Sequence, residues 1–125
     1  FTATMMGSVP GVEVREDKAS ITLSFSDGSF GTILYLANGG SAFPKERIEV
    51  FCDDAVLQMD NYRVLTGYGW SGFKKMRLFK QDKGQKACVH SFVNSIINGR
   101  DAPITYEETI ESSRVSIEVA NTLRG

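Results

Sequence analysis

Histidine and cysteine, on which most metal and nucleophilic sites depend, are scarce in this chain. Of 125 residues, one is histidine (His90) and two are cysteine (Cys52 and Cys88). One histidine excludes a histidine-pair metal site within the chain. We expect His90 to be a solvated residue beside an apolar stripe, and therefore expect no Ser-His-Asp triad around it. The cysteines lie in no metal-binding spacing. We therefore expect two buried free thiols in a reducing, cytoplasmic setting, and no metal ligand.

A charge excess and a long apolar run are also absent. The 14 basic and 15 acidic residues give a net charge of -1, whereas nucleic-acid and membrane-surface modules usually carry a basic excess. No apolar run approaches the roughly 20 residues that a membrane-spanning helix needs. We therefore expect neither a nucleic acid nor a membrane as a partner.

The glycine pattern of a dinucleotide site is missing as well. No Gly-x-Gly-x-x-Gly follows an expected strand. The stretch Asn38–Ser41 is rich in glycine, but Phe43 and Pro44 follow it and lead into a strand, whereas a phosphate-binding loop opens a helix. We interpret this stretch as a connection at a sheet edge, and we assign no cofactor-binding residue.

What the chain does contain is a series of short patterns typical of β-strands. Its length and its 42% hydrophobic content fit a single globular domain, residues 1–125. Residues Ser20–Ser26 alternate strictly between apolar and hydroxyl side chains, and Asp27–Gly28 signals a tight turn before a return strand at Phe30–Ala37. Further strands are expected at Phe1–Met6, Glu46–Cys52, Ala55–Asp60, Tyr62–Tyr68 and Phe73–Lys80.

The last third of the chain changes to a helical period. An amphipathic stripe, ended by Asn98–Gly99, consists of Val89, Phe92, Val93, Ile96 and Ile97. Thr105 and Glu108 have the spacing of a capping box that starts a helix running to about Leu123. Its expected packing stripe is Ile110, Ser113, Ile117 and Ala120. Strands first and helices last predict an α+β fold: an open, mostly antiparallel sheet with helices packed on one face, two of them C-terminal.

The expected strand Phe30–Ala37 has apolar groups on both faces. One face carries Phe30, Leu34 and Leu36, and the other carries Ile33, Tyr35 and Ala37. A strand of this kind is usually covered on both sides. Two explanations are open: the chain's own loops cover the second face, or the open sheet face is buried against a second copy in a homo-oligomer.

The charged residues give no catalytic group. Asp53–Asp54 forms a turn, and Glu107, Glu108 and Glu111 suit the positive end of a helix dipole. A basic run contains Lys74, Lys75, Arg77, Lys80, Lys83 and Lys86, with Trp70, Phe73 and Phe79 interleaved. The run fits a patch for a phosphorylated or nucleotide ligand, or a solvated strand in which Met76 and Leu78 pack inward. We favour the solvated strand, because charge alone supplies no geometry.

The order of these motifs resembles one known family. The motifs are Asp27–Gly31, Tyr35–Gly39, Pro44–Phe51, Leu57–Tyr62, Phe92–Ile96, Asn98–Gly99 and Pro103–Glu108, before a final helix. Together they span nearly the whole chain and resemble the C-terminal domain of the Gfo/Idh/MocA oxidoreductases, the relatives of glucose–fructose oxidoreductase and inositol dehydrogenase. The sequence is most similar to relatives found with bacterial surface-sugar and polysaccharide synthesis.

The resemblance implies a parent enzyme that moves hydride between NAD or NADP and a sugar or cyclitol. An N-terminal Rossmann domain, missing from this sequence, would be the partner that binds the cofactor. The family's Glu-Lys-Pro motif does not occur here, and its Asp-x-x-x-His motif is absent because Lys86 stands four positions before His90. Since the chain begins at Phe1, we expect it to be a piece of a longer polypeptide whose N-terminal part carries both motifs.

We therefore expect this chain to supply a wall of the substrate cleft and an oligomer interface, with no cofactor site and no catalysis of its own. Two rival functions stay open. One is a non-catalytic binding or scaffolding domain whose sheet face is a protein interface. The other is a nucleotide-sugar binding module that uses the basic run.

Overall fold

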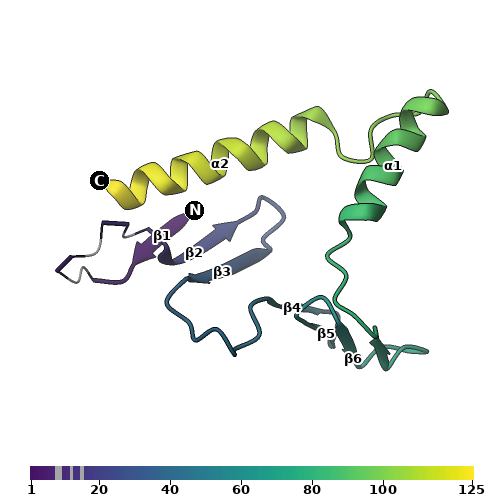
Figure 1. Ribbon diagram of the computed structural model, residues 1–125, viewed down its shortest axis with the longest axis horizontal. Helices are drawn as coiled ribbons and strands as arrows, with labels where there is room; N and C mark the ends of the chain where they lie inside the picture. The colour runs from purple at the N-terminus through teal and green to yellow at the C-terminus, as the bar shows by residue number, and fades with distance from the viewer. Residues whose placement is uncertain (8–9, 12, 15) are drawn as a thin grey trace. The chain divides into compact units, whose positions relative to one another are not determined.

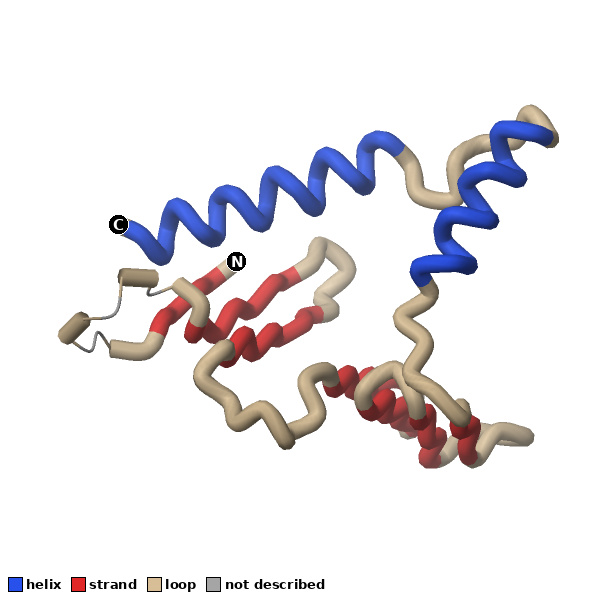
Figure 2. Tube along the Cα trace, viewed as in Figure 1, coloured by secondary structure: helices blue, strands red, loops and turns tan. Residues whose placement is uncertain are grey.

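The chain folds into two compact units, which we describe separately. The computed structural model describes residues 1–7, 10–11, 13–14 and 16–125. Unit 1 comprises residues 1–39 and 104–125, and unit 2 comprises residues 40–103. Each unit contains one antiparallel sheet and one helix (Figures 1 and 2). The predicted α+β class is confirmed, and the strands divide between two open sheets.

Unit 1 has a three-stranded sheet in the order β1-β2-β3. Its elements are β1 (Thr2–Met5), β2 (Lys18–Ser24), β3 (Phe30–Leu36) and α2 (Tyr106–Arg124). The tight turn between β2 and β3 is held by the Asp27 carboxylate, which accepts hydrogen bonds from the Ser29 hydroxyl at 2.7 Å and the Ser29 N–H at 2.9 Å. These bonds stabilise the carboxylate and lower the pKa of Asp27.

Helix α2 packs on one face of this sheet. The core is Ala19, 2% exposed, with Val119 and Leu123, each 7% exposed. The predicted stripe on α2 was wrong, because Ile110 is 47% and Ile117 is 60% exposed. The packed stripe, which Val115 joins, lies on the opposite side of the helix. Its three large side chains bury more apolar area than a stripe containing Ser113 and Ala120 would.

The capping box that starts α2 is confirmed. The Thr105 hydroxyl accepts the Glu108 N–H at 3.1 Å, and the Glu108 carboxylate accepts the Thr105 N–H at 2.9 Å. The backbone N–H and the hydroxyl of Thr105 stabilise the ionised carboxylate and lower the pKa of Glu108. One turn further on, Arg114 bridges Glu111 and Glu118 and lowers the pKa of Glu111.

Unit 2 has a four-stranded sheet in the order β4-β5-β6-β7. Its elements are β4 (Arg47–Cys52), β5 (Ala55–Asp60), β6 (Val64–Tyr68), β7 (Lys75–Arg77) and α1 (Gln85–Ile97). The two-residue turn Asp53–Asp54 has both φ angles positive, at 47° and 59°, as a type I′ hairpin turn requires. Gly69 packs against this turn so closely that a Cβ atom would lie 2.7 Å from the Asp54 carbonyl oxygen.

The apolar face of the second sheet is only partly buried. The strand register places Ile48, Val50, Leu57, Met59, Leu65 and Met76 on this face. Ala55, 9% exposed, is the one buried hydrophobic residue among those described in unit 2, while Ile48 and Val50 are each 47% exposed. The predicted stripe on α1 is exposed as well, from 44% at Val93 to 73% at Ile97. Unit 2 therefore leaves both of its apolar surfaces open.

Two sequence-based predictions about burial were wrong. Cys52 and Cys88 are free thiols as predicted, but both are exposed. Met76 does not pack inward and is 49% exposed, whereas Leu78 is half-buried. The shared reason is that periodicity assigns a residue to a face, and these faces have no layer packed on them within the described residues.

Neither described helix combines the length and apolarity needed to cross a membrane.

Candidate functional site

A cavity of about 420 Å³ lies at one end of the sheet in unit 2. It is lined by Ser41, Ala42, Phe43, Pro44, Lys45, Glu46, Asn61, Gln81 and Lys83. The loop before β4, the turn between β5 and β6 and the segment before α1 all contribute to it. Small-molecule sites in proteins usually have volumes of roughly 300 to 1,000 Å³, so the cavity is large enough for a small ligand.

Glu46 and Lys83 form the charged pair of this cavity. The Lys83 ammonium donates a hydrogen bond to Glu46 Oε1 and lies 5.7 Å from the centroid of the Tyr62 ring. Glu46 Oε2 is buried and accepts no hydrogen bond from the described residues. A buried acceptor without a donor is costly, so this oxygen is suited to a hydroxyl or ammonium group of a ligand.

The turn beside the pair holds two residues in an unusual backbone conformation. Asn61 and Tyr62 both have φ of 50°, which is uncommon for any residue other than glycine and rare for a bulky aromatic. Hydrogen bonds fix the turn: the Asn61 N–H donates to the Glu46 carbonyl at 2.7 Å, and the Gln81 amide donates to Asn61 Oδ1 at 2.9 Å. Conformations of this kind persist where surrounding contacts enforce them, often at ligand sites.

The groups that line this cavity can bind a polar ligand. The cavity offers a carboxylate, two ammonium groups, two amides and a serine hydroxyl, a set that can exchange hydrogen bonds with a polyhydroxylated ligand. None of the lining residues is a histidine or cysteine. No group of three or more His, Cys, Asp or Glu side chains in the described ranges could hold a metal ion.

The described residues do not fit a dinucleotide. The Asp82 carboxylate accepts the Gly84 N–H at 2.8 Å where α1 begins, and the Glu108 carboxylate accepts the Thr105 N–H where α2 begins. The Glu108 carboxylate takes part in the cap of α2, whereas α1 has no side-chain cap. All strand pairs in the described ranges are antiparallel, so these ranges contain no βαβ unit that presents a helix start to a pyrophosphate. No step of nicotinamide chemistry can therefore be assigned to these residues.

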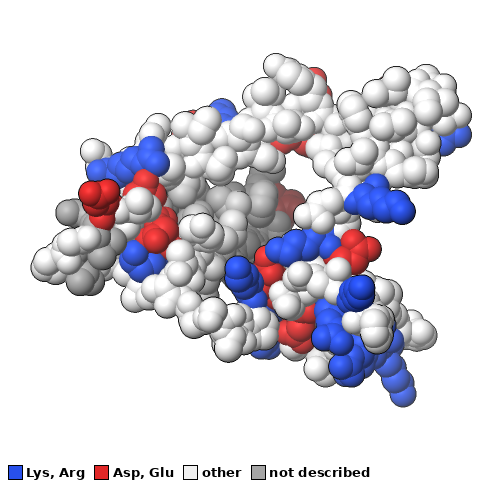
Figure 3. All heavy atoms as spheres, viewed as in Figure 1, with Lys and Arg blue, Asp and Glu red and all other residues white. Residues whose placement is uncertain are grey.

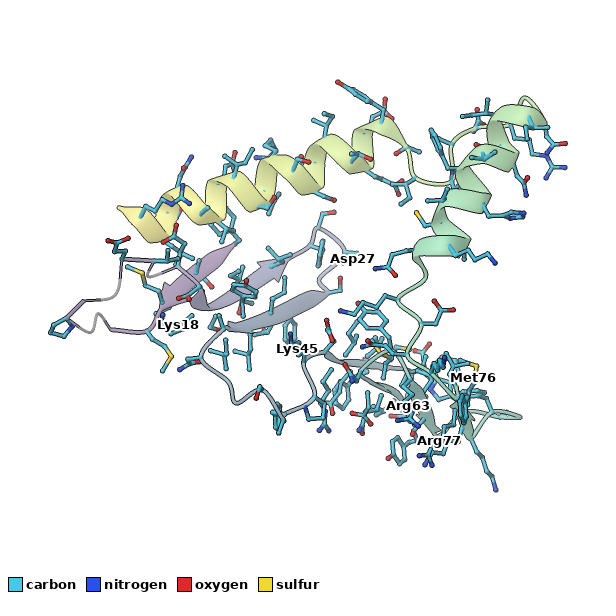
Figure 4. The ribbon with its side chains drawn as sticks, viewed as in Figure 1. Lys18, Asp27, Lys45, Arg63, Met76 and Arg77 are labelled. Atoms are coloured by element: carbon cyan, nitrogen blue, oxygen red, sulfur yellow. The ribbon has the colours of Figure 1, made fainter. Side chains whose placement is uncertain are left out.

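Of the candidate residues considered from the sequence, Ser41 and Lys83 line the cavity, whereas His90 and the rest of the basic run lie outside it. His90 is exposed on α1, with Nδ1 3.2 Å from the Asn94 side-chain nitrogen, so its prediction as a solvated residue is confirmed. Figure 3 shows lysine and arginine side chains gathered around β4–β6, and Figure 4 shows Arg63 and Arg77 side by side there. The Leu78 N–H, which donates to the Arg63 carbonyl at 2.9 Å, joins these two segments.

The cavity itself was missed by sequence reasoning. Lys83 was counted only as a member of the basic run, and the structure instead pairs it with Glu46, 37 positions away. Asn61 gave a local signal, because asparagine is one of the residues that tolerate a positive φ. No pattern in the sequence links that turn to Glu46 or Gln81.

A scan against protein-family models, a search of curated proteins and a search of solved structures each gave no match.

Proposed function

We propose that this chain is the sheet-forming domain of a sugar or cyclitol oxidoreductase similar to the Gfo/Idh/MocA enzymes. In this proposal it forms a wall of the substrate cleft and an oligomer contact, while a Rossmann domain outside this sequence binds NAD or NADP. The exposed free thiols Cys52 and Cys88 agree with a reducing compartment such as the cytoplasm.

The observation that carries the proposal is the surface that the chain leaves exposed. Its accessible surface is 10433 Å². Two separate folded domains, each of half this mass, would together expose only about 8,000 Å². Much of the excess is apolar, since Phe30, Leu34 and Ile97 are 67% to 75% exposed. A chain with so much exposed apolar surface is expected to pack against a neighbouring domain or subunit.

The cavity at Glu46 supports the choice of ligand. A sugar or cyclitol presents several hydroxyl groups and no charge, and it is bound through several hydrogen bonds to groups held in place. Glu46 Oε2 supplies an acceptor without a donor, and the Gln81–Asn61 bonds fix the neighbouring amides. These residues supply contacts and orientation only.

The test is an assay of the complete reading frame that contains this chain. Its product is expected to oxidise a sugar or cyclitol with NAD or NADP, and the 125-residue chain alone is expected to show neither turnover nor tight nicotinamide binding. The Glu46→Gln variant of the complete protein should raise KM with kcat little changed, because the residue contributes only to binding. Turnover by the isolated chain, or a parent protein without a nucleotide-binding domain, would refute the proposal.

A second candidate is a non-catalytic scaffolding domain. The exposed stripe on α1 favours it, because a helix whose apolar side chains are 44% to 73% exposed can dock a protein as readily as a domain of its own polypeptide. The same assay separates the two functions. A scaffold would show no oxidoreductase activity in the complete protein.

A further inference from the structure

The edge formed by β3 differs from every other sheet edge that the structure describes. The two sheets end in β1, β3, β4 and β7. Edge strands are commonly protected from pairing with other chains by charges, by short length or by a covering element. β4 carries the ion-paired Arg47 and Glu49, β7 is a three-residue strand with Lys75 and Arg77, and β1 has four residues beside α2.

β3 has none of these protections. It is seven residues long, Phe-Gly-Thr-Ile-Leu-Tyr-Leu, without a charged residue or proline. Phe30 is 75% exposed, Leu34 is 67% exposed and Tyr35 is 57% exposed. A long, apolar and unguarded edge is a strong template for strand pairing.

The backbone groups that face outward from β3 can be identified. The Ala37 N–H donates to the Asp17 carbonyl at 3.0 Å, and the Phe25 N–H donates to the Ser29 carbonyl at 2.9 Å. With the observed register, odd-numbered residues of β3 therefore exchange hydrogen bonds with β2. The N–H and C=O groups of the even-numbered residues, Phe30, Thr32, Leu34 and Leu36, point toward the open edge.

The apolar side chains on the face away from α2 are also confined to this edge. On that face β1 presents Thr2 and Thr4, and β2 presents Lys18, Ser20, Thr22 and Ser24. Only β3 adds large apolar groups there, namely Phe30, Leu34 and Leu36. A layer covering the whole face would meet hydroxyl groups, whereas a strand added at the edge would meet apolar ones.

We propose that β3 pairs antiparallel with β3 of a second copy of this chain, across a two-fold axis at Ile33. This register places Phe30 opposite Leu36 of the second copy, Thr32 opposite Leu34, and Gly31 opposite Tyr35. The pairs Phe30–Leu36 and Thr32–Leu34 join outward-facing residues, so each exchanges two backbone hydrogen bonds. No charge faces a like charge, and an aromatic ring covers the glycine. The inference does not depend on the oxidoreductase proposal.

The exposed area is sufficient for such an association. A standard interface buries roughly 800 Å² on each partner. The surface of 10433 Å² exceeds what two isolated folded units expose by about 2,400 Å². An isologous strand pair can therefore form while other apolar surface stays free for a further domain.

A register-specific cross-link tests the pairing in the full 125-residue chain, with Cys52 and Cys88 replaced by serine. Facing Cα atoms in a non-hydrogen-bonded pair are about 4.5 Å apart, which a disulfide can bridge. The Ile33→Cys variant is therefore expected to form a disulfide-linked dimer on mild oxidation. The matched control is Tyr35→Cys, whose two copies would be separated by about 13 Å and should stay unlinked.

Analytical ultracentrifugation of the unoxidised chain supplies the second measurement. We expect a dimer whose dissociation constant rises by about tenfold or more in Leu34→Lys, because lysine replaces an apolar contact twice in the symmetric pair. Glu49→Lys on the guarded β4 edge should leave the dimer unchanged. A monomer at all concentrations, or equal cross-linking at both cysteine positions, would overturn the proposal, and either result would favour pairing of β3 within its own polypeptide.

Discussion

The two units use similar parts and reach different degrees of burial. In unit 1, helix α2 packs Val119 and Leu123 onto Ala19, and all three are at most 7% exposed. In unit 2, the helix stripe and the sheet face are both apolar and both open, with Ala55 the sole buried hydrophobic residue of its described part. The difference shows that an apolar stripe identifies a face that a helix can bury, but not whether that face is buried in the folded chain.

The units also differ in charge. Unit 1 has four basic and eight acidic residues, whereas unit 2 has ten basic and seven acidic residues. The net charge of -1 is therefore the sum of an acidic unit and a basic one. In unit 2 the basic residues include Lys75 and Arg77 on the edge strand β7, where they protect the edge from pairing. The acidic unit instead contains the unprotected edge β3.

The largest expected effect is on the core of unit 1. Leu123→Ala should lower its free energy of unfolding by about 2–5 kcal/mol, because the side chain is 7% exposed and its removal leaves a cavity. The matched control is Ile117→Ala on the opposite side of α2, where the side chain is 60% exposed and the change should stay within about 0.5 kcal/mol. Urea unfolding followed by far-UV circular dichroism measures both.

The same titration tests whether the units are independent. Trp70 is the one tryptophan of the chain and belongs to unit 2, so its fluorescence reports on that unit. Leu123→Ala should leave the Trp70 transition in place. An equal shift of both transitions would show that the two units unfold together. In that case a separate free energy of unfolding could not be assigned to each unit.

The second effect concerns the backbone of unit 2. Gly69→Ala should destabilise this unit by about 1–3 kcal/mol more than Gly72→Ala does, as measured by Trp70 fluorescence. Both glycines have positive φ, at 74° and 77°, so the conformational penalty is shared. Only at Gly69 would the new Cβ lie 2.7 Å from a carbonyl oxygen, while nothing lies within 4 Å at Gly72. Equal losses of stability in the two variants would mean that the Asp53–Asp54 turn moves away from the new Cβ atom at no cost in free energy.

The elements of both units could be predicted from the sequence, and their packing could not. Alternation located β2, the Asp27–Gly28 turn signal located β3, and the Thr105–Glu108 spacing located the start of α2, because these signals come from neighbouring residues. The packed face of α2 was misassigned, since two apolar stripes on one helix cannot be ranked without their partner surface. The cavity was missed for a related reason: Glu46 and Lys83 meet through the fold and not through spacing.

The third and smallest effect is at the start of α2. Thr105→Ala should lower the stability of unit 1 by about 1 kcal/mol, because the Glu108 N–H loses its acceptor. Thr122→Ala is the matched control. Its hydroxyl bonds the Glu118 carbonyl at 2.8 Å near the other end of the helix and caps nothing. Thermal unfolding by circular dichroism distinguishes the two. A similar loss of stability in both variants would mean that the hydroxyl of Thr105 contributes nothing as a helix cap.

The pH dependence of this cap follows from Glu108. The pKa of its carboxylate is lowered from 4.5 by the Thr105 N–H and hydroxyl, so the folded chain holds the charged form more strongly than the unfolded chain. The resulting stabilisation is present above pH 4.5 and is lost as the pH falls through the lower folded pKa. Glu111 and Asp27 shift in the same direction, so the informative quantity is the difference between the wild type and Glu108→Gln. That difference should shrink on acidification below pH 4.5, while the unit 2 transition keeps the same pH dependence in both proteins.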